Sequence, residues 1–173
     1  MFVDYKPFQG EKFDLYLQPY AMRVYNQRWY VVGRFKESGK IRNIALDRIL
    51  RMEITDESFT LPEDFDAGEY YAHTVGIFVN ESLKPQRVVL RTYGVSTEYM
   101  RSVPLHPSQR EIATNGNESS DFEYYLNLTP ELTGKLLSKG DWIEVVEPKE
   151  LREEVKKYAE AISNLYRKKH FWE

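Results

Sequence analysis

The sequence contains no cysteine, which excludes disulfide bonds, thiolate catalysis and zinc sites built on sulfur. Its three histidines, His73, His106 and His170, are too widely spaced to form a paired metal-binding motif. No run approaches the roughly 18 apolar residues of a membrane-spanning helix, and the first residues lack the apolar stretch of a secretory signal. We therefore expect a cytoplasmic protein with no disulfide, metal or cofactor.

The chain contains enough apolar residues to form a core. It also contains one strongly basic stripe. Of its 173 residues 42% are hydrophobic and 14% aromatic, which suits one large domain or two small ones. The whole chain has a net charge of −3, but residues 23–51 carry a local charge of +6. Such a stripe attracts anions. Its eight cations are Arg23, Arg28, Arg34, Lys36, Lys40, Arg42, Arg48 and Arg51, against the acids Glu37 and Asp47.

The first sixty residues alternate between apolar and polar side chains, as short antiparallel strands do. Asn26-Gln27 and Ser38-Gly39 supply hairpin turns between successive strands. Several short strands with little helix between them favour a closed β-barrel, because closure removes exposed sheet edges. We predict such a barrel over residues 1–59.

The pattern of the sequence changes after residue 59. Residues 60–85 are predicted to be a linker with a helix over about 67–78, which Asp66 caps. Residues 86–173 then read β-α-β-β-α-β, the order of a ferredoxin-like sandwich, followed by a terminal helix from about residue 148. The apolar stripe of that helix must cover something, and we expect a homodimer. The fold class is therefore α+β.

Several ordered motifs resemble those of the WYL-domain proteins. In the first half they are Gln18-Pro19-Tyr20, Trp29-Tyr30-Val31 and the segment from Arg42 to Ile49. Residues 104–109 and 140–152 resemble the extension domain that commonly follows a WYL domain. The resemblance implies an Sm-like or SH3-like barrel followed by a ferredoxin-like domain. It also implies the sensor part of a bacterial transcriptional regulator, whose barrel binds a negatively charged ligand, in some members single-stranded nucleic acid.

Three positions depart from the family pattern. Val31 replaces the leucine of the signature, Ile44 replaces an aromatic residue, and Gln18 stands where many members have histidine. Such regulators also carry an N-terminal helix-turn-helix, and only that segment would bind duplex DNA. Its absence from these 173 residues leaves two interpretations, the C-terminal part of a longer protein or a stand-alone sensor.

Arg42 and Arg48 are the leading candidates for binding an anion, because a guanidinium offers a planar fork of donors to two phosphate oxygens. For Arg48 the alternative is an internal ion pair with Asp47. Arg23 and Arg28 are supporting candidates. Tyr20 could stack on a base or plug the barrel mouth.

Trp29 and Tyr30 have opposite parity in their predicted strand. Trp29 is in phase with Val31, which indicates the core, with a position lining the site as the alternative. Tyr30 would then lie on a ligand surface or on a solvated barrel exterior.

The chain is expected to be a ligand-sensing regulatory module and not an enzyme. Its ligand would be a nucleotide or a short single-stranded nucleic acid. The alternative is a homodimerisation scaffold with no specific ligand. His106 invites a general-base interpretation, but no nucleophile lies at a recognisable spacing, and a turn shaped by Pro104 and Pro107 explains this segment better.

Overall fold

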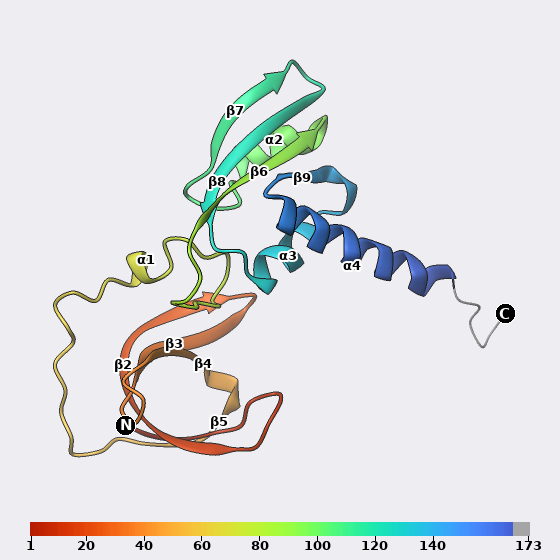
Figure 1. Cartoon of the computed structure of the whole chain (residues 1–173). Helices are drawn as coiled ribbons and strands as arrows, with labels where there is room; N and C mark the ends of the chain where they lie inside the picture. The colour runs from red at the N-terminus through yellow and green to blue at the C-terminus, as the bar shows by residue number, and fades with distance from the viewer. Residues whose placement is uncertain (168–173) are drawn as a thin grey trace. The chain divides into compact units, whose positions relative to one another are not determined.

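The computed structural model describes residues 1–167, so His170 lies outside the described residues. The chain divides into two compact units, Met1–Ala72 (unit 1) and His73–Glu173 (unit 2), each with its own core (Figure 1). Within the described residues, no helix is both long enough and apolar enough to cross a membrane.

Unit 1 is an antiparallel five-stranded sheet with the strand order β4-β3-β2-β1-β5. Asn26 and Gln27 have positive φ angles of 48° and 62°, which a tight hairpin turn between two strands requires, and Gly39 has one of 65°. Both predicted hairpin turns are therefore confirmed. The elements are β1 (Phe2–Tyr5), β2 (Phe13–Tyr25), β3 (Arg28–Phe35), β4 (Ile41–Ala45), the 3₁₀ turn η1 (Leu46–Arg48), β5 (Ile49–Glu53) and α1 (Ala67–Tyr70).

The sheet of unit 1 is open, so the prediction of a closed barrel is wrong. β4 and β5 lie at opposite edges of the sheet, and no ladder joins them within the described residues. They are neighbours in sequence, but the single 3₁₀ turn of η1 carries the chain from one edge to the other. The strands curve strongly, as Figure 1 shows, yet their hydrogen bonding does not close.

The predicted positions of Trp29 and Tyr30 are also wrong. Trp29 is 53% exposed, because it pairs with Val24 in the part of the β2–β3 hairpin beyond the last pair of β3 with β4, Tyr30 with Ala45. Tyr30 is only 9% exposed, so it does not lie on a solvated exterior. Both faces of β3 are thus covered at its centre, and parity alone does not separate core from surface.

The predicted helix over 67–78 is reduced to its first turn. Asp66 caps α1 as expected, since its carboxylate accepts a hydrogen bond from the amide of Glu69 at 2.7 Å. The helix then ends at Tyr70, whose hydroxyl donates to the carbonyl of Ile41 at 3.4 Å. The hydroxyl of Tyr71 donates to the side chain of Asn43. These contacts with β4 hold the chain on a non-helical path.

Unit 2 contains the predicted β-α-β-β-α-β order, and its strands form an antiparallel sheet in the order β7-β8-β6-β9. Thr129 caps α3 by accepting from the amide of Leu132 at 3.2 Å, with Pro130 at the first helical position. The elements are β6 (Gln86–Tyr93), α2 (Val95–Ser102), β7 (Arg110–Asn115), β8 (Ser119–Leu126), α3 (Pro130–Leu137), the 3₁₀ turn η2 (Gly140–Trp142), β9 (Ile143–Glu147) and α4 (Lys149–Arg167).

The helices of unit 2 pack on one face of its sheet. Leu132 and Leu136 of α3 and Leu151 of α4 join the apolar side chains of the strands in one buried cluster. The opposite face of β6 and β8 carries charged residues such as Arg91 and Asp121 in cross-strand positions. The burial of β8 alternates regularly along the strand, which explains why this strand could be predicted from sequence.

Candidate anion-binding site

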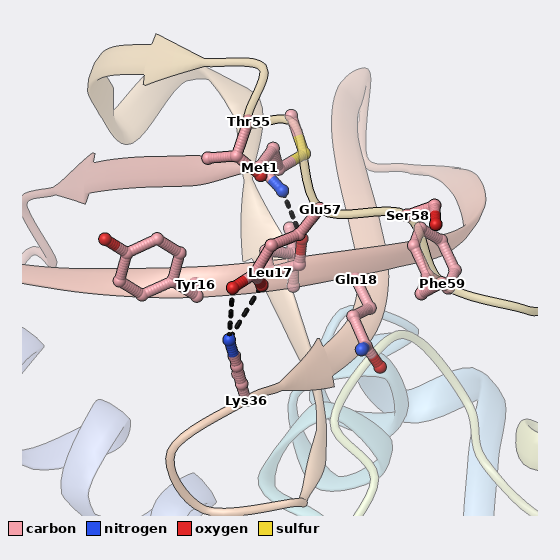
Figure 2. Close-up of a pocket in the computed structure, with 9 residues that line it drawn as sticks. All are labelled: Met1, Tyr16, Leu17, Gln18, Lys36, Thr55, Glu57, Ser58 and Phe59. Carbon is pink, nitrogen blue, oxygen red and sulfur yellow. Dashed lines mark hydrogen bonds and ion pairs between the residues drawn. The ribbon is translucent and has the colours of Figure 1, made fainter.

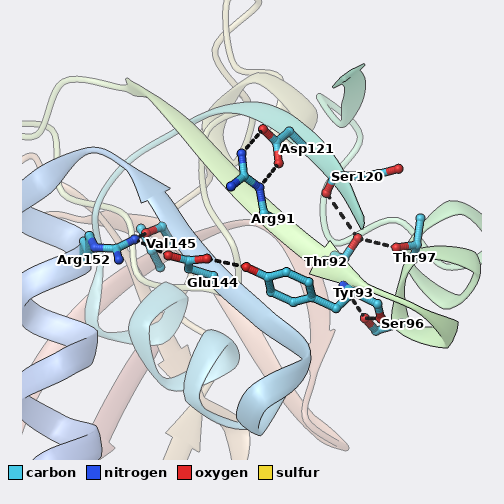
Figure 3. A network of polar contacts seen from close by, with 10 residues as sticks. All are labelled: Arg91, Thr92, Tyr93, Ser96, Thr97, Ser120, Asp121, Glu144, Val145 and Arg152. Atoms are coloured by element: carbon cyan, nitrogen blue, oxygen red, sulfur yellow. Dashed lines mark hydrogen bonds and ion pairs between the residues drawn. The ribbon is translucent and has the colours of Figure 1, made fainter. Parts of the chain in front are cut away.

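The arginines of unit 2 from β6 to the first turn of α4 are paired with carboxylates. Arg91 donates two hydrogen bonds to Asp121, at 2.7 and 2.8 Å, and Arg152 donates to Glu144 at 2.7 Å (Figure 3). The others follow the same pattern: Arg87 with Glu123 and Glu147, Arg101 with Glu98 and Glu111, and Arg110 with Glu123.

This pairing changes the pKa values of the carboxyl groups in unit 2. The guanidinium of Arg91 lowers the pKa of Asp121, and that of Arg101 lowers the pKa of Glu111, because each hydrogen bond favours the ionised carboxylate. The charges of these arginines are thus largely compensated inside unit 2. They offer little to an external anion.

Four arginines of unit 1 have no carboxylate partner in residues 1–167: Arg23, Arg34, Arg42 and Arg48. Three of them lie over aromatic rings instead. Measured from Cζ to the ring centroid, Arg23 is 3.9 Å from Tyr71, Arg34 is 6.0 Å from Tyr20, and Arg48 is 3.5 Å from Phe8. A cation–π contact holds a guanidinium in place without neutralising it.

The structure brings together two of the predicted site residues, Arg28 and Arg48, at the ring of Phe8. The Cζ of Arg28 lies 5.3 Å from the centroid of the ring that Arg48 covers. The Nε of Arg28 is also 3.0 Å from a carboxylate oxygen of Asp47. Asp47 therefore pairs with Arg28 and not with Arg48, so the internal ion pair considered for Arg48 is wrong. We call these four residues the Phe8 cluster.

Two hydrogen bonds from Lys6 to backbone carbonyls fix the loop that carries Phe8. The amide of Lys6 donates to the carbonyl of Arg48 at 3.0 Å, which ties the start of the β1–β2 loop to η1. The Nζ of Lys6 donates to the carbonyl of Gly10 at 3.1 Å and closes the loop around Phe8. The buried Nε of Arg48 has no acceptor among the described residues. The guanidinium of Arg48 is thus held in place beside the ring of Phe8.

The other predicted residues lie elsewhere in unit 1. Arg42 pairs with Gly33 along β4, and its guanidinium donates to the carbonyl of Ile41 at 3.2 Å, so it is not brought to Arg48. Arg23 is covered by Tyr71, which is 6% exposed. Tyr20 packs with its ring centroid 4.8 Å from that of Phe65. Tyr30 is buried and pairs with Ala45 of β4.

Comparison with known proteins now places the chain in a family. The WYL domain matches residues 2–54, which hold the sheet of unit 1, and the WCX domain matches residues 84–163. The chain is a WYL-domain protein. No curated protein matches it as a relative.

Solved structures resemble the WYL–WCX chain only distantly. Proteasome accessory factor B/C (PafBC) of Arthrobacter aurescens is 20% identical with a TM-score of 0.42, and the match covers 98% of this chain and 26% of that one. A CRISPR Cas-related protein is 15% identical with a TM-score of 0.49, covering 96% of this chain and 47% of that one. The chain thus spans about a quarter and about half of these two proteins.

Unit 1 also has two hollows whose lining residues do not include the Phe8 cluster. One holds Lys36, but both oxygens of Glu57 lie within 2.8 Å of its Nζ, and the volume of about 20 Å³ suits a single water (Figure 2). The other, of about 380 Å³, is an apolar groove. It is lined by Met1, Pro19, Tyr20, Ala21, Met22, Val31, Leu46 and Met52. Neither has an unpaired lysine or arginine among its lining residues.

Phe8 and Tyr71 are the site residues that sequence reasoning missed. Phe8 stands between Pro7 and Gly10, in a loop bounded by Lys6 and Lys12. An aromatic residue in such a basic turn is a weak signal on its own. Nothing in the sequence connects Tyr71 with Arg23, which is 48 residues earlier. Cation–π partners that are distant in sequence emerge only from the fold.

His106 lies in the predicted turn and not in a catalytic arrangement. Its Nδ1 accepts a hydrogen bond from the amide of Ser108 at 3.1 Å and lies 2.9 Å from the hydroxyl of that residue. The imidazole therefore stabilises the segment between α2 and β7. No group of three or more metal-ligating side chains occurs in residues 1–167.

Proposed function

We propose that the chain is the ligand-sensing module of a bacterial transcriptional regulator in the cytoplasm. Its ligand would be an anion, namely a nucleotide or a short single-stranded nucleic acid. The observation that carries this proposal is the contrast between the four arginines of unit 1 that have no carboxylate partner in the described chain and the paired arginines of unit 2 from β6 to the first turn of α4. The WYL and WCX domains support the regulatory role.

The chemistry of the proposed site follows from the guanidinium group. It remains charged at every physiological pH and donates two parallel hydrogen bonds to phosphate oxygens. A guanidinium that an aromatic ring already positions loses less side-chain freedom when it binds. Arg48, stacked on Phe8 and free of carboxylates in the described chain, is the side chain best placed for this role.

Sensing requires that the ligand bind two states of the regulator with different affinity. Arg28 offers a physical route to such a difference, because it contacts both Asp47 and the ring of Phe8. An anion at the Phe8 cluster would compete with Asp47 for Arg28 and so alter η1. Duplex DNA would be bound by a helix-turn-helix segment of the regulator and not by these residues.

We also infer a finer description of the fold. The element order of unit 2 and its strand order β7-β8-β6-β9 support a ferredoxin-like sandwich. The curved, unclosed sheet of unit 1 supports an open relative of the Sm-like and SH3-like folds.

A titration with labelled single-stranded oligonucleotide at rising salt tests the proposed function. Each phosphate neutralised on a single strand contributes about 0.7 to the slope of log affinity against log salt concentration. If Arg28, Arg48 and one further arginine each neutralise one phosphate, the slope of log affinity against log salt concentration should be about −2. A slope near zero, or no binding at low salt, would contradict the proposal.

A second candidate function, a homodimerisation scaffold, is favoured by α4. Leu151 is buried in unit 2 and Val155 packs against the same core. Further along the same stripe, Tyr158, Ile162 and Leu165 are 50%, 45% and 58% exposed. The spacing of these five residues alternates between four and three, which is that of a helix seam with a partner helix. We propose that a second copy of the chain covers it.

A further inference from the structure

We infer that Phe8 is a stacking platform for a nucleobase, and that the ligand at the Phe8 cluster is therefore a base-bearing phosphate and not a simple anion. This inference rests on the proposed function, since it specifies the ligand of the same site. The observation that carries it is an exposed aromatic ring with two guanidinium groups beside it.

Exposure alone would not carry the inference, because single exposed apolar side chains are common on protein surfaces. Phe8 is 74% exposed, and it differs from other exposed residues of unit 1 in its surroundings. The Cζ atoms of Arg48 and Arg28 lie 3.5 and 5.3 Å from its ring centroid. One ring is thus in contact with two cations and still presents most of its surface to solvent.

A nucleotide combines the two chemical features that this arrangement matches. Its base has a flat π-face that stacks on an aromatic ring whatever its sequence identity, and its phosphate accepts hydrogen bonds from guanidinium groups. Arg48 has no carboxylate partner in the described structure, and the pairing of Arg28 with Asp47 is half exposed. Inorganic phosphate would engage the arginines alone.

The loop that carries Phe8 is held in the same place by its own contacts. The bonds from Lys6 to the carbonyls of Arg48 and Gly10 do not involve the phenyl ring. Gly10 has a φ of +94°, which a residue with a side chain rarely adopts, so it turns the loop. Replacing Phe8 should therefore leave the loop and the fold intact, which makes the inference testable by substitution.

The test compares two fluorescently labelled strands of about twelve nucleotides, an oligothymidylate and an abasic strand of equal charge. The full chain should bind the oligothymidylate about tenfold more tightly. Phe8→Leu should reduce this preference to near unity, whereas Phe8→Trp should keep or increase it. Phe78→Leu, which alters a half-exposed aromatic residue of unit 2, is the matched control and should leave the preference unchanged.

The outcomes separate the inference from the proposed function. Equal binding of the two strands by the wild-type chain, or an unchanged preference in Phe8→Leu, would overturn the stacking role while leaving anion binding in place. Failure of the wild-type chain to bind either strand would overturn the proposed function and the inference together. Circular dichroism of the variants checks that their fold is that of the wild type.

Discussion

At the scale of single residues, the arginines of the two units differ in the partners that hold them. Arg91 and Arg110 of unit 2 contact carboxylates, whereas Arg23 and Arg48 of unit 1 contact aromatic rings. Ring contacts of this kind contribute about 0.5 to 1 kcal/mol at exposed sites and leave the positive charge available. Charge composition alone could not reveal this difference, because both units are rich in arginine.

Asp47 provides a test at this scale, since it is the acid of the Phe8 cluster and would compete with a bound anion for Arg28. We predict that Asp47→Asn raises the affinity for a single-stranded oligonucleotide several-fold, because it releases Arg28 and adds one positive charge. Isothermal titration calorimetry measures the change. The matched control is Glu63→Gln, which removes an exposed acid that has no ion pair among the described residues of unit 1. Equal gains in the two variants would indicate a general charge effect and count against the Phe8 cluster.

At the scale of elements, the sequence predicts features that neighbouring residues determine. It does not predict features that depend on contacts between distant residues. The turn at Asn26-Gln27 and the cap at Asp66 can be predicted because a few neighbouring residues determine each of them. The closed barrel was wrong because closure depends on whether two sheet edges meet, which periodicity does not encode. For the same reason, Arg48 was identified as a candidate but its partner Phe8 was not.

The exposed stripe of α4 gives a prediction about this element. Ile162→Glu should convert a dimer into a monomer, because it places a charge in the middle of the apolar seam. Sedimentation velocity at several concentrations measures the oligomeric state. Lys157→Glu, which changes an exposed residue off the stripe, should leave the dimer intact. A wild-type chain that sediments as a monomer throughout would reject the scaffold function.

At the scale of the whole molecule, the two units should respond differently to acid. The pKa of Asp121 is lowered by its hydrogen bonds from Arg91, so its ionised form is favoured in the folded state. A carboxyl group whose folded pKa is depressed contributes stability above its unfolded pKa of about 3.9. That contribution is lost as the pH falls through the folded value. Unit 2, which holds most of these ion pairs, should therefore be the more acid-sensitive.

Asp121→Asn tests this assignment by thermal unfolding at pH 7 and at pH 3. The variant should be less stable than wild type at pH 7, and the difference should shrink at pH 3, because the carboxyl group of Asp121 is protonated in the unfolded chain below its unfolded pKa of about 3.9. Asp141→Asn alters an exposed acid of η2 without an ion pair in the described chain, and should give a small, pH-independent change. A constant difference between Asp121→Asn and wild type at both pH values would show that the ion pair does not set the acid response.

The central claim is that unpaired arginines, and not arginine content in general, make unit 1 the anion-binding part. Arg48→Ala and Arg110→Ala each remove one positive charge, but Arg110 is paired with Glu123 and Arg48 has no acid in the described structure. Fluorescence anisotropy with a labelled single-stranded oligonucleotide at low salt should show Kd rising about tenfold or more for Arg48→Ala, equivalent to about 1.4 kcal/mol. It should change less than about twofold for Arg110→Ala. Equal losses in both variants, or no loss in Arg48→Ala, would contradict the account.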